Sequence, residues 1–515
     1  MWTFGRRAGL LLPLSTVRGR SGQLATYADA AEVARWLASA GCTLWQHLPL
    51  SEISPGQDSP YAASSSNALE PVYVDLAAVE DAGAPEPAER EVLERDADFS
   101  RVDFEAVRQV KRRVLERAWT RFRDREVRTG SERARAFERF RAEHAAWLED
   151  WALYRALHDR RQASWRSWEP ELRERAPGAL EAARAELRDV LDGLEYVQWL
   201  ADEQWRSARK ACNQIGVKVI GDLPFMVAED SSDVWSLQRF FRFDATVGVP
   251  PDAYSAEGQD WGLPVPRWDE MRAAGDPWLH QRADRAAELF DAMRVDHVVG
   301  LYRTFVRPVD KSPPCFVPGE EGAQREQGER ILGLLGEKAE VLAEDLGVVP
   351  PFVRRSLAEK GLPGTKVLRW EDDAGVFRDP AQFPRISLAV CGTHDTEALA
   401  VWWESLRDHE RAAQLRLPRL RALAERPFAE NRRFDPAVHE AMMEMLYGSA
   451  SDAVLVPIND ALGWRDRLNT PGTVGPHNWT FRIPWRLDEL WTAEEPVALA
   501  RRLLDLARRH GRITT

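Results

Sequence analysis

The stretch Asp291-Ala-Met-Arg-Val-Asp-His-Val-Val-Gly-Leu-Tyr-Arg303 joins a short apolar run to a cluster of charged residues. Phe290–Val295 is predicted to be a short buried strand, with Arg294, Asp296 and His297 at its C-terminal end. Residues two apart on a strand point to the same face, so Arg294 and Asp296 are expected to lie side by side. A nearby guanidinium lowers the pKa of a carboxyl group and keeps it ionised. Asp296 is therefore either a nucleophile at the mouth of a barrel or half of a structural ion pair.

Seven further apolar runs of similar length occur along the chain, and most are separated by amphipathic segments such as Tyr27–Ala40 and Glu326–Gly336. Short apolar strands that alternate with helices predict a parallel sheet. Eight such units predict an α/β fold, a (β/α)8 barrel with its active site at the C-terminal ends of the strands. The predicted strands are Gly9–Leu14, Thr43–Leu48, Val217–Leu223, Phe290–Val295, Ala339–Ala343, Thr365–Trp370, Ser387–Cys391 and Ala453–Pro457.

Two segments interrupt this alternation. Residues 81–216, between the second and third predicted strands, show helical periodicity over Phe104–Arg128, Ala134–Arg160 and Leu180–Gln214. They are predicted to form a mainly helical subdomain, inserted between a first part of the barrel, residues 1–80, and the rest, residues 217–515. The second segment, Gly248–Trp268, is rich in Pro, Gly and aromatic residues and is predicted to be an active-site loop.

The amino-acid composition limits the possible binding partners and the cellular compartment of the protein. An apolar fraction of 44% and a charged fraction of 30% are typical of a soluble globular protein. The net charge of −12 argues against a nucleic-acid or anionic-membrane partner. No apolar stretch is long enough to cross a membrane, and the run that Pro13 interrupts is too short for a signal peptide. Four widely spaced cysteines without metal-ligand spacing indicate a reduced, cytoplasmic protein.

Three of the predicted strands end in a carboxylate, namely Asp296 on the fourth, Glu344 on the fifth and Asp395 on the seventh. Because parallel strands present their C-terminal ends on one face, these carboxylates are expected to converge, which is costly without a function. Two carboxylates that flank a bond are the equipment of retaining glycoside chemistry. Burial and a negative neighbour would raise the pKa of Glu344 and suit it to acid/base catalysis, whereas Asp345 faces the opposite way. Asp395, with His394, would hold sugar hydroxyls.

In their order and spacing, the motifs of this chain resemble those of the amylomaltase, or 4-α-glucanotransferase (disproportionating enzyme), family of the α-amylase clan. The match extends over nearly the whole length, and the sequence holds no HExxH, P-loop, dinucleotide-binding or G-x-S-x-G motif. The matching blocks are Trp45-Gln-His-Leu-Pro-Leu50, Asp58-Ser-Pro-Tyr61, Trp147-Leu-Glu-Asp-Trp-Ala152, Gly221-Asp-Leu-Pro224, Asp230-Ser-Ser-Asp-Val-Trp235, Gly248-Val-Pro-Pro-Asp252, Gly258-Gln-Asp-Trp-Gly262, Arg294-Val-Asp-His297, Ala343-Glu-Asp-Leu-Gly347, Gly392-Thr-His-Asp395, Leu468-Asn-Thr-Pro-Gly-Thr473 and Asn478-Trp479.

The resemblance implies a role for each matched residue. Asp296 matches the nucleophile, Glu344 the general acid/base and Asp395 the stabiliser of the transition state. It also implies α-1,4-glucan and maltooligosaccharide donors, glucose or maltooligosaccharide acceptors, no organic cofactor and no catalytic metal. The implied substrate-binding residues are Tyr61 as an aromatic platform under the −1 sugar, Asp222 as a clan-wide active-site Asp, Arg294, His297 and His394 around that sugar, and Asp252, Gln259 and Trp261 in a mobile loop on the acceptor side.

The chain departs from the family pattern at several positions. The segment after the first strand reads Ser15-Thr-Val-Arg-Gly19 in place of Thr-Ser-Leu-Pro-Gly. Single replacements are Leu263 for Asn, Pro266 for Tyr, Val299 for Arg and Thr396 for Asn. Because the three carboxylates are intact, a transferase is predicted, and the substituted loop residues predict a measurable hydrolytic leak beside transfer. The alternatives are an α-glucan hydrolase of the same clan and a catalytically idle glucan-binding protein, since fold does not determine function.

Overall fold

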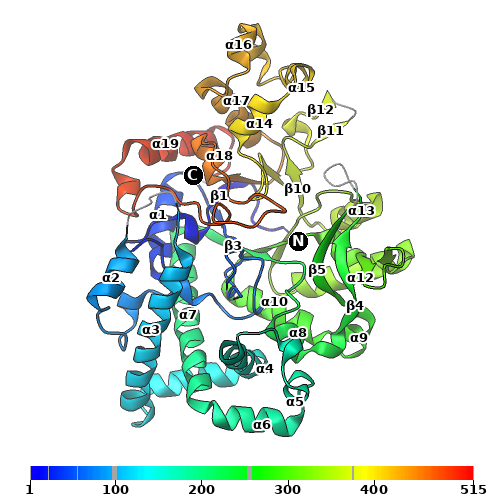
Figure 1. Ribbon diagram of the computed structural model, residues 1–515. Helices are drawn as coiled ribbons and strands as arrows, with labels where there is room; N and C mark the ends of the chain where they lie inside the picture. Colours follow the sequence, from blue (N-terminus) through cyan, green and yellow to red (C-terminus); the bar gives the residue numbers. More distant parts are fainter. Residues whose placement is uncertain are drawn as a thin grey trace.

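Eight parallel strands close into a barrel at the centre of the molecule (Figure 1). The computed structural model describes residues 2–20, 22–54, 56–95, 101–251, 258–373 and 376–513. Neighbouring strands follow the order β1-β14-β13-β10-β9-β6-β3-β2, which confirms the predicted barrel. Each predicted strand overlaps one of them: β1 (Arg7–Leu11), β2 (Leu44–Gln46), β3 (Lys218–Leu223), β6 (Ala292–Val295), β9 (Glu340–Ala343), β10 (Gly364–Val367), β13 (Ser387–Val390) and β14 (Ala453–Pro457).

Because side chains alternate along the strands, apolar residues fill the barrel and polar residues lie at its C-terminal end. Ile220 of β3 and Ala292 of β6 belong to a buried aliphatic cluster to which seven of the eight strands contribute. Two residues further on, the same faces carry Asp222 and Arg294. In these two strands an apolar interior position is thus followed by a charged one at the C-terminal end. The other strand residues of the cluster are Leu44, Leu342, Val367, Leu388, Val390, Ala453 and Leu455.

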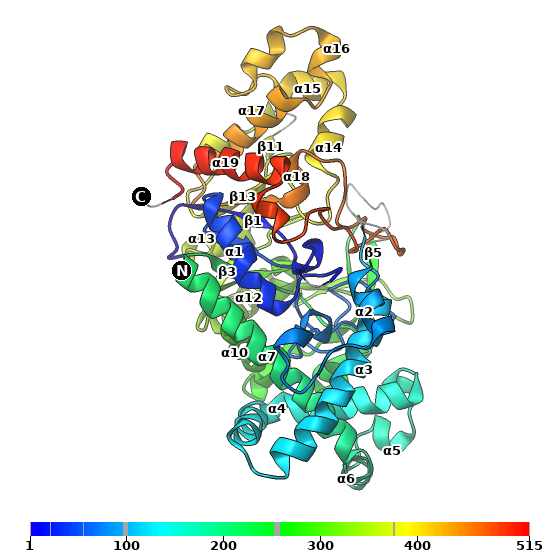
Figure 2. The same ribbon diagram turned by 90° about the vertical axis from the view of Figure 1, so that its left-hand side faces the viewer.

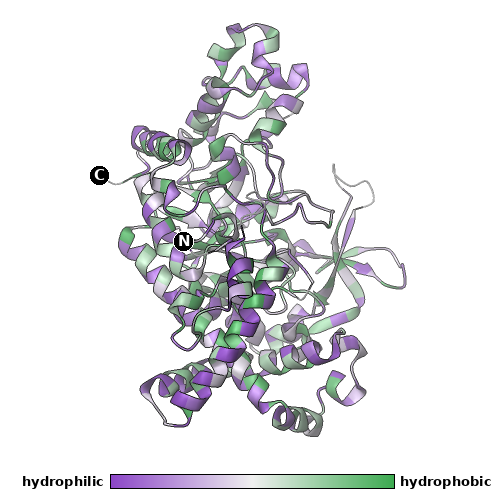
Figure 3. Ribbon diagram, turned by 60° about the vertical axis from the view of Figure 1, so that its left-hand side comes forward, coloured by the Kyte–Doolittle hydropathy of each residue, from purple (hydrophilic) through white to green (hydrophobic). Residues whose placement is uncertain are grey.

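Amphipathic helices cover the outside of the barrel, and successive members of this layer contact one another. In α19 (Glu494–Arg509) the buried residues Leu499, Leu503 and Leu506 recur at the spacing of a single helix face. Figure 3 shows the hydrophobic and hydrophilic residues that alternate along these helices. Within the described part of the chain, no helix has the length and apolarity needed to span a bilayer. The other helices of this layer are α1 (Ala30–Ser39), α7 (Arg188–Ile215), α10 (Pro277–Leu289), α12 (Glu321–Gly336) and α13 (Pro351–Glu359).

Helices fill the long segment between β2 and β3, as predicted. They comprise α2 (Pro87–Glu94), α3 (Phe104–Phe122), α4 (Glu132–Arg161), α5 (Pro170–Arg173), α6 (Pro177–Glu186) and α7. The third predicted helical segment is divided in two, because α6 and α7 are interrupted at Leu187. An aromatic cluster, which includes Phe122, Phe137 and Tyr196, packs α3, α4 and α7 together.

The segment predicted to be a loop is largely a β-hairpin. β4 (Phe241–Val249) and β5 (Gln259–Pro266) pair antiparallel, and β7 (Thr304–Pro308) and β8 (Cys315–Val317) extend them into a four-stranded sheet. Register shifts between Arg242 and Thr246 and between Val247 and Gly248 interrupt the pairing of β4 with β5. The prediction therefore erred because Pro and Gly were taken as loop signals, whereas a bulged hairpin also accommodates them.

A second group of helices lies at the opposite end of the molecule from α4–α6 (Figures 1 and 2). It consists of α14 (Leu399–Ser405), α15 (Asp408–Gln414), α16 (Phe428–Asn431) and α17 (Pro436–Tyr447), all between β13 and β14. The remaining elements are the small pair β11 (Asp372–Asp373) and β12 (Val376–Phe377), and the short helices α8 (Ser232–Ser236), α9 (Trp268–Ala273), α11 (Val298–Tyr302) and α18 (Ile458–Leu462).

Candidate active site

Asp296 and Glu344 lie on adjacent strands at the mouth of the barrel. The register pairs Val295 of β6 with Ala343 of β9, so each carboxylate is the next residue after a paired position. The backbone N–H of Glu344 donates to the carbonyl of Val295 over 3.0 Å, which carries the pairing one residue further. Neighbouring strands are about 4.8 Å apart, and the two carboxylates consequently start from backbone positions that lie side by side.

Arg294 joins two carboxylates from neighbouring strands. Its Nη1 donates to both oxygens of Asp222 over 2.8 Å, and its Nη2 lies 2.8 Å from Oδ1 of Asp296. The side-by-side arrangement predicted for Arg294 and Asp296 is therefore present. Asp222 is fully buried, and burial raises its pKa while Arg294 opposes that shift. One guanidinium thus balances two closely spaced negative charges.

Tyr61 connects this cluster to the other side of the barrel. Its hydroxyl donates to Oδ2 of Asp222 over 2.8 Å, and its ring stacks on the imidazole of His394 at 5.2 Å with an interplanar angle of 23°. Nε2 of His394 lies 3.3 Å from Oδ2 of Asp395. An unbroken series of contacts therefore links the predicted nucleophile to the third carboxylate, from Asp296 through Arg294, Asp222, Tyr61 and His394 to Asp395.

The environments of Glu344 and Asp395 shift their pKa values in opposite directions. Burial raises the pKa of Glu344 to about 8, against the opposing effect of Arg294. The side chain of Asp395 is partly exposed, and His394 and the amide of Asn469 hold its pKa well below its ordinary value. At neutral pH Glu344 is protonated and Asp395 ionised. Such a separation is typical of sites in which one carboxyl group donates a proton and another stabilises positive charge.

His297 holds Glu344 through its backbone. It adopts a left-handed conformation with φ of 44°, which is rare for a residue with a side chain. In this conformation its N–H donates to Oε2 of Glu344 over 2.7 Å, while the N–H of Leu346 donates to Oε1 over 3.1 Å. Both carboxyl oxygens are therefore oriented by the main chain. The neighbouring Asp345 accepts from the N–H of Thr365 and joins β9 to β10, which agrees with its predicted orientation away from the site.

Three residues at the site were not singled out from the sequence. Nδ2 of Asn469 donates to Oδ1 of Asp395 over 2.6 Å, and Nη2 of Arg467 donates to the carbonyl of Asp395 over 2.6 Å. The ring of Trp479 lies 5.8 Å from those of Tyr61 and His394. Asn469 and Trp479 fall in blocks that match the family, and this is the only signal for them in the sequence.

The β4–β5 hairpin brings Trp261 to the site. The ring of Trp261 meets the imidazole of His297 edge-on at 4.9 Å, and its Nε1 donates to the side chain of Gln259 over 3.3 Å. Gln259 is exposed on β5, next to the predicted acceptor side. Asp252 lies outside the described residues.

The substituted positions have different surroundings. Leu263 is partly exposed on β5 and pairs with Val247, whereas Pro266 is buried opposite Phe241 at the base of the hairpin. Val299 is buried within α11. The hydroxyl of Thr396 accepts from the N–H of Thr393 and donates to its carbonyl, which closes the turn that carries Asp395.

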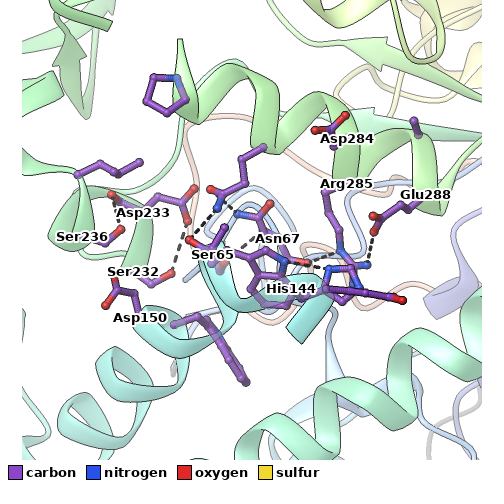
Figure 4. A pocket seen from close by; sticks show the side chains of 18 residues that line it. Ser65, Asn67, His144, Asp150, Ser232, Asp233, Ser236, Asp284, Arg285 and Glu288 are labelled. Carbon is purple, nitrogen blue, oxygen red and sulfur yellow. Dashed lines mark hydrogen bonds and ion pairs between the residues drawn. The ribbon is translucent and has the colours of Figure 1, made fainter. Parts of the chain in front are cut away.

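A separate pocket of about 710 Å³ lies between α4, α8 and α10 (Figure 4). At one end, potential ligand atoms of His144, Asp202 and Glu288 come within 4.8 Å of one another. Nη1 of Arg285 lies 2.5 Å from Oδ1 of Asp202 and 2.9 Å from Oε2 of Glu288. Because the guanidinium of Arg285 bridges the two carboxylates, this group is an ion-pair network that ties α10 to α7.

Comparison with known proteins agrees with this geometry. Residues 12–488 match the family model described as 4-alpha-glucanotransferase. The 4-alpha-glucanotransferase of Thermus thermophilus is 33% identical over 495 residues, which cover 93% of this chain and 95% of that protein. The chloroplastic/amyloplastic 4-alpha-glucanotransferase of Solanum tuberosum is 28% identical over 526 residues, with coverage of 99% and 87%.

Solved structures give the same picture. An amylomaltase from Streptococcus agalactiae, in complex with acarbose, matches with a TM-score of 0.85 at 25% identity, covering 99% of this chain and all of that one. An amylomaltase from Corynebacterium glutamicum, at 23% identity, shares the fold with a TM-score of 0.80 over 97% of this chain and 75% of that one. Since the family model spans most of the chain and the bacterial relative is of nearly equal length, the chain belongs to the 4-alpha-glucanotransferase family.

Proposed function

We propose that this 4-alpha-glucanotransferase moves α-1,4-glucan segments between maltooligosaccharides by a retaining double displacement. The observation that carries this mechanism is the pairing of Asp296 and Glu344 on adjacent strands. One of these carboxylates is bound by a guanidinium, and the other has a pKa raised to about 8. Retaining glycosidases use two carboxyl groups in this way, one as nucleophile and one as acid/base.

In the first half-reaction, Asp296 attacks the anomeric carbon of the −1 sugar while Glu344 gives its proton to the oxygen of the leaving glucan. The bond from the anomeric carbon to that oxygen breaks, and a β-glycosyl ester with Asp296 forms. Arg294 orients Asp296 before attack through their 2.8 Å ion pair. Ionised Asp395 stabilises the positive charge that develops on the sugar ring.

In the second half-reaction, Glu344 acts as a base. It takes the proton of a 4-hydroxyl group on an acceptor sugar, and that oxygen attacks the anomeric carbon and releases Asp296. We propose glucose and maltooligosaccharides as the acceptors. Tyr61 is proposed to lie under the −1 sugar, a role supported by its hydrogen bond to Asp222 and its stacking on His394.

Transfer competes with hydrolysis, because water is also able to attack the glycosyl ester. The transferase outcome requires a site that excludes water while an acceptor binds in attack geometry. The β4–β5 hairpin is proposed as that cover, since its Trp261 packs against His297 beside the nucleophile. Leu263 replaces an amide on the same hairpin, and Asp395 has a side chain that is 46% exposed. Both observations favour a measurable hydrolytic leak.

Incubation with maltotriose tests the proposal. A transferase should release glucose together with maltopentaose and longer chains, while the total of reducing ends stays constant. A hydrolase would instead produce glucose and maltose, with reducing ends rising in step. Reducing ends that rise as fast as maltotriose disappears would overturn the transferase mechanism in favour of the hydrolase. Unchanged maltotriose at high enzyme concentration would favour the idle glucan-binding protein.

A cytoplasmic location is also proposed. The chain has four cysteines, all of them described, and none takes part in a disulfide. Unpaired thiols are typical of reducing compartments. Cell fractionation with antibodies against the protein is the measurement that checks this location.

A further inference from the structure

Tyr61 sits at the far end of an irregular hairpin formed by the segment that follows β2. The two arms are joined by antiparallel bridges between Ser51 and Leu69 and between Ile53 and Ala63. The backbone N–H of Glu52 donates to the carbonyl of Ala68 over 2.8 Å, and that of Ser64 donates to the carbonyl of Glu52 over 2.8 Å. We call the described residues of this segment, 51–54 and 56–69, the Tyr61 hairpin. It contains little regular structure, so side-chain contacts must contribute to its position.

Glu52 connects the first arm of the hairpin to α4. Its carboxylate is buried and accepts hydrogen bonds from three donors: Ser64 Oγ at 2.9 Å, Trp151 Nε1 at 2.9 Å and Arg155 Nη1 at 3.2 Å. Ser64 belongs to the hairpin itself. Trp151 and Arg155 come from α4, in the helices inserted after the hairpin in the chain.

A buried carboxylate is held firmly only when its charge is compensated. Burial raises the pKa of Glu52, and Arg155 and the indole of Trp151 oppose that shift. The same Arg155 forms an ion pair of 3.2 Å with Asp159 on the next turn of α4, which orients its guanidinium. Removing one donor from a buried charged group leaves that group without part of its compensation. The hairpin would then shift or let in water.

We propose that Trp151 and Arg155 are positioning residues of the transfer reaction, which hold the Tyr61 hairpin through Glu52. This inference rests on the function proposed for Tyr61, whose ring must stay against His394 while its hydroxyl reaches Asp222. The inserted helices thereby act on the −1 site without touching the substrate. They are a part of the catalytic machinery that lies outside the barrel.

The second arm of the hairpin is held from a different side. Oδ2 of Asp233, from α8, accepts from the N–H of Ser66 at 2.9 Å, and the indole of Trp278 donates to Oδ1 of the same carboxylate over 2.9 Å. Figure 4 shows Asp233 beside the arm that carries Ser65 and Asn67. Loss of the Glu52 contacts therefore loosens one arm while the other remains attached. The expected result is misplacement of Tyr61 and not unfolding of the hairpin.

Trp147 provides a matched control on the same helix. It lies one turn before Trp151 and is also buried. Its Nε1 donates to Nδ1 of His144 over 3.4 Å, on the side of α4 that faces the pocket of Figure 4. Its ring packs edge-on against that of Trp151 at 6.2 Å, but its indole N–H forms no hydrogen bond to the described residues of the Tyr61 hairpin. Trp147→Phe and Trp151→Phe remove the same indole N–H from two buried sites. Only the second change removes a bond to the Tyr61 hairpin.

The test is a double-mutant cycle on kcat/KM for maltotriose disproportionation. Trp151→Phe is expected to lower kcat/KM about two- to ten-fold, the range of one buried hydrogen bond, while thermal unfolding stays cooperative. In a Tyr61→Ala background the same change should have an effect of less than about two-fold, because the residue through which it acts is gone. Trp147→Phe should have equal small effects in both backgrounds. Arg155→Lys should recover part of the activity that Arg155→Met loses, since the charge beside Glu52 is kept.

Equal effects of Trp151→Phe in the two backgrounds would overturn the inference, because Trp151 would then act independently of Tyr61. Wild-type kcat/KM in both Trp151→Phe and Arg155→Met would overturn it as well. If Trp151→Phe does not fold, Glu52→Gln replaces it in the same cycle and faces the same two outcomes. A Tyr61→Ala variant with wild-type turnover would refute the role proposed for Tyr61, and with it this inference. If Tyr61→Ala is impaired and Trp151→Phe has the same effect in both backgrounds, this inference is refuted but the role proposed for Tyr61 stands.

Discussion

The backbone N–H of His297 donates a 2.7 Å hydrogen bond to Oε2 of Glu344. His297 follows β6 directly and adopts a left-handed conformation with φ of 44°. The residue directly after the proposed nucleophile thus orients the proposed acid/base. A single turn of the chain coordinates the two carboxyl groups on which the mechanism depends.

His297→Gly and His297→Val are predicted to separate the backbone role of this residue from its side chain. Glycine adopts the left-handed conformation without cost, whereas a β-branched residue pays about 1–3 kcal/mol there. The bond from His297 lowers the pKa of Glu344, so its loss in His297→Val should move the basic limb of the pH profile of kcat/KM upward. His297→Gly should keep that limb in place. Identical limbs and unfolding temperatures in the two variants would contradict the backbone role.

The raised pKa of Glu344 predicts a cost in stability at high pH. In the folded protein this pKa is raised from 4.5 to about 8, so the native state holds a proton that the unfolded chain releases. The native state is therefore favoured below about pH 4.5 and loses this advantage as pH rises through 8. Glu344→Gln, which stays neutral, should unfold at a higher temperature than the wild type at pH 8 to 9 and at a similar one near pH 5. Calorimetry at both pH values is the check, and a difference that does not grow with pH would rule out a buried ionisation.

Asp296→Asn is predicted to fold normally and to lose activity by several orders of magnitude, because the covalent route disappears. Rates of glucose release from maltotriose measure the effect, and thermal unfolding serves as the control for folding. A variant that retains more than about a tenth of wild-type turnover has lost only about 1.4 kcal/mol of barrier reduction, and Asp296 would then not be the nucleophile.

Glu344→Gln is predicted to discriminate between donors. Maltotriose needs protonation of its leaving oxygen, whereas α-glucosyl fluoride leaves with little help from an acid. The variant should therefore be slowed far more with maltotriose than with the fluoride, and mass spectrometry with the fluoride should find the glycosyl group on Asp296. Equal slowing with both donors, or a label on another residue, argues against the acid/base assignment.

Leu263→Asn is predicted to lower the KM for the acceptor while leaving donor hydrolysis nearly unchanged. An amide on the partly exposed face of β5 restores a hydrogen bond worth about 0.5–1.5 kcal/mol. Pro266→Tyr provides the contrast, because position 266 is buried and a larger side chain there should destabilise the hairpin without improving acceptor binding. An acceptor KM that does not respond to Leu263→Asn would mean that β5 does not line the acceptor side.

Much of the barrel was predictable because its strands are recognised from local patterns in the sequence. Short apolar runs such as Phe290–Val295 end in charged residues, and the alternation of side chains places Arg294 and Asp296 on one face. The convergence of Asp296, Glu344 and Asp395 on one end of the barrel follows from parallel topology alone. No contact between distant residues is needed for either inference.

The β4–β5 hairpin and the contacts that hold the site residues in place could not be predicted from the sequence. β4 pairs with β5 and with β7, and the barrel strand β6 lies between β5 and β7 in the chain. The pairing of Thr246 with Arg307 therefore forms only when the chain has folded around β6. Pro and Gly in Gly248–Trp268 indicate a loop as readily as a bulged hairpin. Local propensity does not distinguish these two structures, because the hydrogen bonds that do so come from elsewhere in the chain.

The sequence by itself therefore determined the order of the barrel strands and the face on which the carboxylates gather. Only the tertiary structure decided that Glu52 meets Trp151, 99 residues away, and that Asp395 meets Asn469, 74 residues away. Strand periodicity is set by neighbouring residues, whose side chains alternate whatever the rest of the chain does. Hydrogen bonds between remote side chains depend on how helices and loops close over the barrel, and that closure is a property of the packed chain as a whole.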